Sequence, residues 1–195
     1  MSLRYDLKII DNLITKGSSV LDIGCGEGLL LKKLKDKKCS VKGMEIDITN
    51  AQKAVEKGLS VIQGDAESDL KYYPDNSFDY VIMAETIQAT KQPKEILEDL
   101  FRIGKSVIIS IPNFGYYKNR LQLMFKGVMP VNKHLSYQWY ETPNIHFCTV
   151  RDLENLFNEI NVQVTDKLFI SNNKKTGRFM ANLFSEKAVF VLKRF

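Results

Sequence analysis

The chain contains few of the residues that build disulfide frameworks or metal centres. Its 195 residues include three cysteines and two histidines. The odd number and wide spacing of the cysteines argue against a disulfide framework and fit a reducing cytoplasm. No group of His, Cys, Asp or Glu has the spacing of metal ligands, so the sequence predicts no metal site.

Long apolar runs are also missing. No apolar stretch approaches the roughly 20 residues that a membrane-spanning helix needs. The first residues, MSLRYDLKIIDNLITKG, mix acids with apolar residues and contain no small-residue cleavage pattern. This pattern indicates an amphipathic helix rather than a signal peptide. We therefore expect a cytoplasmic protein with no membrane partner.

An excess of charge of one sign is present but weak. Lys and Arg number 28 against 23 Asp and Glu, which gives a net charge of +5. Such an excess can attract nucleic acid. Here the basic residues are spread over residues 31–38, residues 172–178 and the end of the chain. This distribution is typical of solvated helix faces and loops, so we expect no nucleic-acid partner.

Short β-rich runs alternate with helical segments over the first 112 residues. The alternation predicts βαβ units and a mostly parallel sheet with helices on both faces, an α/β fold in one domain over residues 1–195. The last two β-rich runs have no helix between them and are expected to pair antiparallel at the sheet edge. The predicted strands are 19–24, 40–46, 59–65, 78–84, 105–112, 162–170 and 187–194, and the predicted helices 28–37, 49–58, 93–104 and 149–161. Thr49 and Thr149 are expected to cap the helices that follow them.

Residues 113–147 interrupt this alternation. They hold eight of the chain's 20 aromatic residues (11 Phe, 8 Tyr and 1 Trp) and four Lys or Arg against a single acid, Glu141. Loops of this length are functional or disordered, and this one is too aromatic to be disordered. Three interpretations stay open: a partner surface, a lid whose Tyr137, Trp139 and Tyr140 line a ligand pocket, or core in which LQLMF forms a short helix folded onto the sheet.

The stretch VLDIGCGEG predicts a ligand site at the end of the first strand. Gly24 and Gly26 permit a tight turn and let a ligand approach the backbone. The helix that follows offers free N–H groups at its start. The spacing is G-x-G-x-G, whereas the dinucleotide fingerprint requires glycine at position 29, where this chain has Leu29. A glycine turn by itself could be only a tight connection.

Acids follow the next two predicted strands and strengthen the prediction. Glu45 ends the second strand, where a carboxylate can accept hydrogen bonds from both hydroxyls of a ribose. Asp65 ends the third strand, where it could accept from an adenine amine beside the N–H of Ala66. Asp22 lies inside the first strand and needs partners there, so we expect it to orient the turn or to reach a ligand amino group.

These residues, together with YPDNSFDYVI before the fourth strand, resemble class I S-adenosylmethionine-dependent methyltransferases. The resemblance covers about residues 15–112 and the terminal strand pair. It implies a seven-stranded sheet whose last strand is antiparallel, with S-adenosylmethionine (AdoMet) or S-adenosylhomocysteine as cofactor. The expected cofactor contacts are Asp22, Gly24, Cys25, Gly26, Glu45, Ile46, Asp65, Ala66 and Glu85.

A narrower resemblance extends over nearly the whole chain. The stretches AETIQAT (84–90), IPNFGYYKNRLQLMFKGVMPV (111–131), YQWYETPNIHFCTVRDLENL (137–156) and ANLFSEKAVFVL (181–192) resemble the MetW family of methionine-biosynthesis proteins. The resemblance implies a role in methionine biosynthesis beside a homoserine O-acyltransferase. The alternative is an active methyltransferase on a small-molecule acceptor, because methyl transfer depends on positioning and needs few catalytic groups.

Candidates for direct chemistry are few. His146 is a weak candidate for a general base, since histidine titrates near neutral pH, but it could equally be a core histidine. The other candidates are His134, Glu85, Tyr137 and Tyr140. Gln88 and Thr90 follow the fourth strand and either hydrogen-bond a substrate or cap the loop. The chain has no G-x-S-x-G elbow and no [DN]-P-P-[FY] motif, with which amino-methyltransferases of nucleic acids hold an amine.

Overall fold

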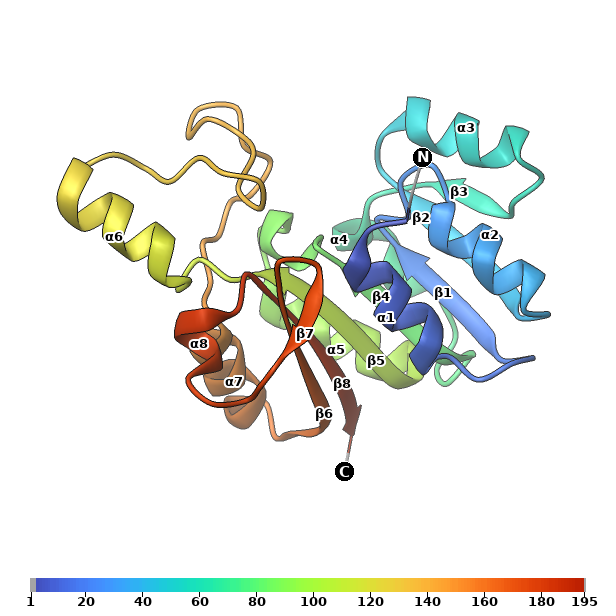
Figure 1. Cartoon of the computed structure of the whole chain (residues 1–195). Coiled ribbons are helices and arrows are strands. Elements are labelled where there is room, and N and C mark those ends of the chain that lie inside the picture. The colour runs from blue at the N-terminus through green and yellow to red at the C-terminus, as the bar shows by residue number, and fades with distance from the viewer. Residues whose placement is uncertain (1–2, 195) are drawn as a thin grey trace.

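The computed structural model describes residues 3–194 and shows helices packed on both faces of one sheet (Figure 1). The predicted α/β class is confirmed. Eight strands lie in the order β3-β2-β1-β4-β5-β8-β6-β7. They are β1 (Ser19–Ile23), β2 (Ser40–Glu45), β3 (Val61–Gln63), β4 (Phe78–Ala84), β5 (Gly104–Pro112), β6 (Val162–Ser171), β7 (Lys174–Thr176) and β8 (Lys187–Arg194).

The first five strands pair in parallel, so their carboxyl ends meet at one edge of the sheet. β8 runs antiparallel to β5 and to β6, as predicted. It lies between these two strands, however, and not at the sheet edge. Because it runs in the opposite direction, its first residue Lys187 lies opposite Pro112, at the carboxyl end of β5.

The eighth strand corrects the expectation of seven. β7 pairs antiparallel with β6 across a two-residue turn, Asn172–Asn173. Both residues have left-handed backbones, with φ of 52° and 54°. Two successive positive φ values make the type I′ turn that matches the twist of a hairpin, and asparagine tolerates this conformation well.

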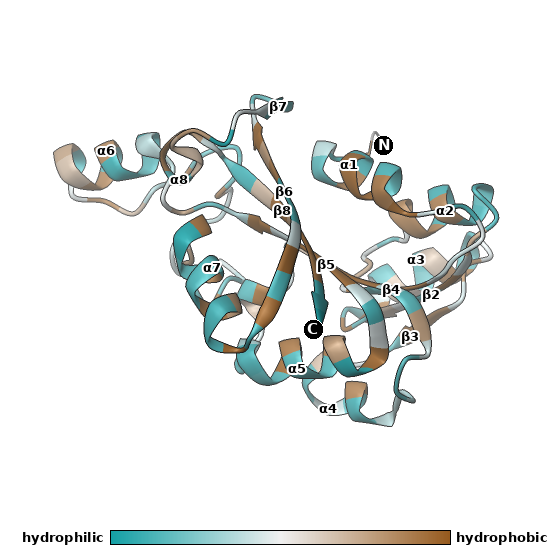
Figure 2. Ribbon diagram, turned by 90° about the horizontal axis from the view of Figure 1, so that it is seen from below, coloured by the Kyte–Doolittle hydropathy of each residue, from teal (hydrophilic) through white to brown (hydrophobic). Residues whose placement is uncertain are grey.

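Two layers of apolar side chains lie on opposite faces of the sheet. Alternation along β1 sends Val20 to one face and Leu21 to the other. Val20 packs with α1 (Tyr5–Leu13) and α2 (Leu29–Asp36). Leu21 packs with α5 (Pro93–Ile103) and α7 (Val150–Glu159). Figure 2 shows these two helix pairs on opposite sides of the apolar central strands.

Two predicted helix starts have different outcomes. Thr149 caps α7 in a reciprocal capping box with Asp152, as predicted. Thr49 does not cap α3 (Ile48–Glu56). Asp47 does so instead, because its side chain accepts the N–H of Asn50 at 2.8 Å. The remaining helical segments are α4 (Ala66–Asp69), η1 (Leu70–Tyr72), η2 (Ile87–Ala89), α6 (Tyr117–Lys126) and α8 (Ala181–Phe184).

The segment 113–147, named the insert from here on, projects from the carboxyl edge of the sheet (Figure 1). Its helix α6 contains LQLMF. Of the three interpretations, the one in which this stretch is core folded onto the sheet is wrong, because Met124 is 66% exposed and Phe125 74%. The start of the insert is fixed by the buried Asn113. Its Nδ2 donates to the backbone oxygen of Ser185 at 2.8 Å, and its Oδ1 accepts the N–H of Gly115 at 3.0 Å.

Two features are absent from the described part of the chain. Among residues 3–194, no helix is both long enough and apolar enough to cross a membrane. The same residues contain no cluster of three or more His, Cys, Asp or Glu side chains that could hold a metal ion.

Candidate functional site

β1 ends in a turn whose first position requires glycine. Gly24 and Gly26 have left-handed backbones, with φ of 71° and 55°. The N–H of Gly24 donates to the backbone oxygen of Met44 at 2.8 Å, which fixes the turn against β2. A Cβ on Gly24 would lie 2.4 Å from Oγ1 of Thr86 in the loop after β4, whereas nothing lies within 4 Å of a Cβ built on Gly26. The turn therefore leaves open space in front of Gly26.

Glu45 lies at the end of β2 and holds the glycine turn in place. Its carboxylate is 7% exposed. Oε2 accepts the N–H of Gly26 at 2.6 Å, and Oε1 accepts the N–H of Asp47 at 3.0 Å. Each carboxylate oxygen has a second lone pair, so the carboxylate keeps the capacity to accept from a ligand. The predicted contact with a ribose stays a prediction.

Asp65 follows β3 and begins α4. Its Oδ1 accepts the N–H of Glu67 at 3.0 Å, which orients the carboxylate at the start of the helix. It lines a cavity of about 240 Å³ with Ile46, Ala66 and Gly24. The structure thus brings together four of the predicted cofactor contacts. We name this cavity the β2–β3 cavity.

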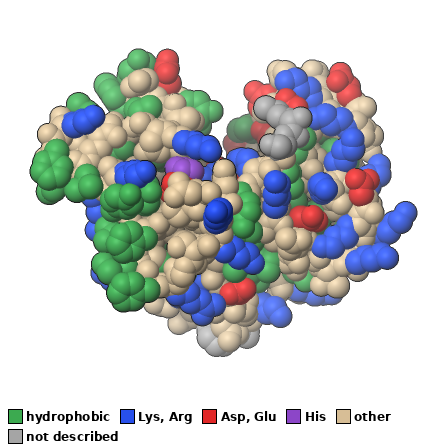
Figure 3. Space-filling model, viewed as in Figure 1, with side chains coloured by type: hydrophobic (Ala, Val, Ile, Leu, Met, Phe, Trp, Pro, Cys, Tyr) green, Lys and Arg blue, Asp and Glu red, His purple; other side chains and the backbone are tan. Residues whose placement is uncertain are grey.

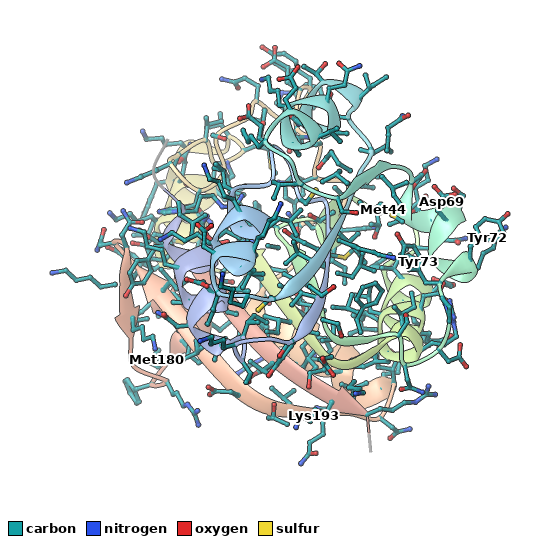
Figure 4. All side chains as sticks on the ribbon, turned by 90° about the vertical axis from the view of Figure 1, so that its right-hand side faces the viewer. Met44, Asp69, Tyr72, Tyr73, Met180 and Lys193 are labelled. Carbon is teal, nitrogen blue, oxygen red and sulfur yellow. The ribbon has the colours of Figure 1, made fainter. Side chains whose placement is uncertain are left out.

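One acid of α4, Glu67, joins two segments of the chain that line the β2–β3 cavity. The Glu67 carboxylate accepts the N–H groups of Lys91 and Gln92 and so joins α4 to the loop after η2. Met44 extends from β2 toward the segment that carries Asp69, whereas Tyr72 points away into solvent (Figure 4). Glu67 therefore connects two segments that both line this cavity.

A second cavity, of about 320 Å³, lies on the other side of Gly24 and is lined by Asp22, Cys25, Gly26 and Arg4. We name it the glycine-turn cavity. Burial raises the pKa of Asp22 to about 7, against the opposing charge of Arg4. Burial also raises the pKa of the Cys25 thiol, which therefore stays protonated at neutral pH. Cys25 is accordingly a lining residue and not a nucleophile.

Charged residues that the sequence did not single out complete this region. Arg4 pairs with Asp6 at 2.9 Å and with Glu85 at 3.1 Å. Lys187 pairs with the other oxygen of Glu85. Asp6 is 1% exposed and also accepts from the Ser110 hydroxyl at 3.2 Å. Glu85, a predicted cofactor contact, is therefore held between two basic residues.

The sequence held a signal for the position of two residues at this edge. The stretch SEKAV places Glu186 directly before the last strand and Lys187 at its first position. Because this strand is antiparallel, its first residues lie at the carboxyl ends of the parallel strands. Glu186 is buried there, and its Oε2 pairs with Nε2 of His134 at 2.8 Å. Burial lowers the pKa of His134, although the charge of Glu186 opposes this effect.

A third cavity, of about 210 Å³, lies under the insert, and we name it the insert cavity. The predicted residues Gln88, Tyr137 and Trp139 line it together with Arg4. Tyr140 is not among its lining residues. It is 67% exposed and packs edge-on against Trp139 with ring centroids 5.6 Å apart. Figure 3 shows the surface hollowed between the lobe that carries α6 and the lobe that carries α3.

The remaining candidates, His146 and Thr90, differ in burial and in whether they line a cavity. His146 is exposed, and its side chain is not among the lining residues of the three cavities. Its backbone N–H donates to the backbone oxygen of Gln88 at 2.9 Å. Thr90 is buried, caps the loop through a hydrogen bond to Ile87 and also lines the β2–β3 cavity. Both interpretations of Thr90 are thus compatible with its position.

The strand order and the ligand-sized cavities at the carboxyl ends define a class I methyltransferase-like fold. An S-adenosylmethionine-dependent methyltransferase from Mesorhizobium loti has the same fold, with a TM-score of 0.72 at 13% sequence identity over 97% of this chain and 98% of that chain. At this identity the likeness concerns the fold alone. The predicted Rossmann-like methyltransferase fold is confirmed.

The chain matches the model of the family described as methionine biosynthesis protein MetW over residues 4–192, and it belongs to this family. It is 33% identical over 179 residues to the bifunctional methionine biosynthesis protein MetXA/MetW of Rhodopirellula baltica, a match that covers 87% of this chain and 29% of that protein. It is 29% identical to a mitochondrial ubiquinone biosynthesis O-methyltransferase of Dictyostelium discoideum over 83% of this chain and 56% of that enzyme. The chain thus spans less than two thirds of the length of both relatives.

Proposed function

We propose that the protein binds AdoMet or S-adenosylhomocysteine at the glycine turn and acts with a homoserine O-acyltransferase in methionine biosynthesis. The observation that carries the cofactor proposal is the placement of Asp22, Glu45 and Asp65 around an open turn. They lie on β1, at the end of β2 and after β3, at the edge where open α/β sheets bind ligands.

The residues present fit the chemistry of this cofactor. The open space at Gly26 admits a ligand against the backbone. Ile46 is 63% exposed in the β2–β3 cavity and offers an apolar surface for an adenine ring beside the acceptor Asp65. Glu45 supplies acceptors for ribose hydroxyls, and Asp22 supplies a buried acid for the amino group. When bound, AdoMet supplies a methyl group activated by a positively charged sulfur.

Calorimetric titration of AdoMet into the purified protein tests the cofactor proposal. We expect saturable binding that Asp65→Ala weakens by about tenfold, because one hydrogen bond is worth about 1 kcal/mol or more when the partner is charged. Asp36→Ala is the matched control, since Asp36 is an exposed acid at the end of α2. If neither AdoMet nor S-adenosylhomocysteine binds, or if both variants weaken binding alike, the cofactor proposal is refuted.

The acyltransferase partnership is supported by the relative from Rhodopirellula baltica. Its name joins MetXA and MetW in one chain, and we take the MetXA portion to be the homoserine acyltransferase. Two activities that share one chain in a relative are candidates for a complex between separate chains here. The family resemblance to MetW points to the same partner.

The outer face of α6 is the surface that suits this partner. Met124, Phe125 and Val128 are 66%, 74% and 52% exposed and form an apolar patch at the end of the projecting helix (Figure 3). Aromatic and Met residues are enriched in protein interfaces. The insert also carries four Lys or Arg against one acid, so the complementary surface of the acyltransferase should be acidic.

Binding of the homoserine O-acyltransferase from the same source, measured by calorimetry, tests this surface. Phe125→Ala should weaken the complex by about 2 kcal/mol, or roughly thirtyfold, if Phe125 is an anchor residue. Tyr72→Ala is the control, because Tyr72 is equally exposed at 75% and lies across the molecule from α6 (Figure 4). Absence of binding by the unmodified protein would refute the partnership, and equal effects of the two variants would refute the assignment to α6.

An active methyltransferase on a small acceptor is the second candidate. The insert cavity favours it, because Arg4 lines both this cavity and the glycine-turn cavity. The two spaces are therefore neighbours, as a methyl donor and an acceptor must be. The test is formation of S-adenosylhomocysteine from AdoMet when a small-molecule extract of the source cells is added. No turnover above that of boiled protein would count against this function.

A further inference from the structure

The insert cavity contains a buried acceptor that lacks a partner. Gln88 is 4% exposed. Its Nε2 donates to the backbone oxygen of Glu85 at 2.7 Å and to Oδ1 of Asn144 at 3.2 Å. A backbone oxygen only accepts, so the amide cannot be turned around. Its Oε1 consequently has no hydrogen-bond partner among the described residues, and such a buried group costs about 1–3 kcal/mol.

The backbone at Gln88 explains why this amide is held firmly. The backbone oxygen of Gln88 accepts the N–H groups of Ile145 and His146, both at 2.9 Å. These two bonds fasten the far end of the insert to the loop after β4. Glu85, three residues earlier, has a left-handed backbone with φ of 57°, which is uncommon for a side chain of this kind. Strained residues of this type concentrate at functional sites.

The charged residues that line the insert cavity, Arg4 and Glu85, are already paired. Glu85 pairs with Arg4 at 3.1 Å and with Lys187. Arg4 also pairs with Asp6 at 2.9 Å. Both bases are thus engaged by acids, so an anionic ligand finds no free partner among these residues.

Aromatic side chains form the outer part of the same cavity. Tyr137 and Trp139 line it and are 53% and 68% exposed, so their rings are accessible from solvent. The faces of such rings attract cations by about 0.5–2 kcal/mol. An orphan acceptor and aromatic faces in one cavity are groups that recognise an organic ammonium ion.

We propose that the insert cavity binds a small organic ammonium compound, with its N–H group donating to Oε1 of Gln88 and its apolar part against Tyr137 and Trp139. This site lies apart from the two cavities at the glycine turn, since it shares only Arg4 with the glycine-turn cavity and none of its residues line the β2–β3 cavity. Of the predicted cofactor contacts, only Glu85 lines it. The proposal therefore goes beyond cofactor binding and beyond the acyltransferase partnership.

The single tryptophan provides a direct probe of this site. Trp139 is the only tryptophan, so a ¹H–¹⁵N spectrum contains one indole N–H signal from the cavity. We would titrate the cofactor-free protein at pH 7 with three molecules of similar shape: 3-methylbutylamine, 3-methylbutanol and 3-methylbutanoate. We expect the amine to shift the signal saturably and to bind about tenfold more tightly than the alcohol, and the carboxylate to cause no saturable shift.

A pair of tyrosine variants tests the location. Tyr137→Leu should weaken amine binding about three- to thirtyfold, the range that loss of a cation–π contact allows. Tyr72→Leu is the matched control, because Tyr72 is an exposed tyrosine that lines none of the three cavities. We expect it to leave the amine affinity within about twofold.

Three results would overturn the proposal. The first is no saturable shift with the amine up to about 50 mM, which covers the affinity range of fragments this small. The second is equal affinity for amine and alcohol, and the third is equal weakening by Tyr137→Leu and Tyr72→Leu. Because the titration uses cofactor-free protein, failure here leaves the AdoMet proposal standing, and failure of AdoMet binding leaves this proposal standing.

Discussion

The buried acid of the glycine-turn cavity makes stability depend on pH in a defined direction. Asp22 is 3% exposed, and burial raises its pKa to about 7, although Arg4 opposes this effect. In an unfolded chain an aspartate titrates near pH 3.9. Between about pH 4 and pH 7 the folded protein therefore keeps a proton that the unfolded chain has released.

The sign and size of the effect follow from proton linkage. Where the folded state binds more protons, the free energy of unfolding falls as pH rises. Raising a pKa from 3.8 to about 7, at about 1.4 kcal/mol per pKa unit, corresponds to about 4 kcal/mol lost by pH 8. Asparagine has the shape of the protonated acid and does not ionise. Asp22→Asn should therefore match the unmodified protein near pH 4 and exceed its stability by about 4 kcal/mol at pH 8.

Urea unfolding followed by circular dichroism, at intervals from about pH 2 to pH 8, measures this difference. Taking the difference between the two proteins cancels the contributions of other titrating groups. Asp79→Asn is a control of opposite sign, since the Ser19 N–H and Lys105 lower the pKa of Asp79 to about 2. That variant should be the less stable protein at pH 8, and the gap should close as pH falls toward about 2. A pH-independent difference for Asp22→Asn, or a loss of stability at pH 8, would refute the reasoning.

Three further substitutions have defined outcomes in urea unfolding. Gly24→Ala should destabilise the protein by about 2 kcal/mol and abolish AdoMet binding in calorimetry. The backbone at Gly24 is left-handed, and the added Cβ would collide with Thr86. An unchanged affinity for AdoMet would contradict this prediction. Asn113→Ala should cost about 2–4 kcal/mol, since it removes the bonds that fix both ends of the insert. Thr149→Ala should cost about 1 kcal/mol through loss of the capping box, and a change below a few tenths would contradict that role.

The parts of the site that could be predicted from sequence are those that depend on short-range pattern. Gly24, Glu45 and Asp65 each follow or end a β-rich run, and parallel pairing brings such positions to one edge. The hydrogen-bond partners of these three residues do not follow from the pattern, and neither do their contacts with a ligand. The two oxygens of Glu45, for example, accept backbone N–H groups whose positions depend on the folded turn.

The parts that could not be predicted depend on contacts between distant segments. Glu85 is paired with Arg4 from the start of the chain and with Lys187 from near its end. No local pattern encodes that meeting, which depends on the place of β8 between β5 and β6. The stretch LQLMF shows a second limit of sequence patterns. Its periodicity predicts a helix correctly, but it does not say whether the apolar face of that helix meets the sheet, solvent or another protein.

The loop after β4 contributes residues to both proposed ligand sites, so the two ligand affinities can be linked through it. Thr86 contacts the glycine turn and lines the β2–β3 cavity, while Glu85 and Gln88 in the same loop line the insert cavity. A ligand that moves this loop at one site therefore changes the other. Reciprocity requires that AdoMet alter the affinity for an amine by the same factor by which the amine alters the affinity for AdoMet. A factor of one in both titrations would mean that the loop is rigid and that the two cavities, although different residues of this loop line each of them, act independently.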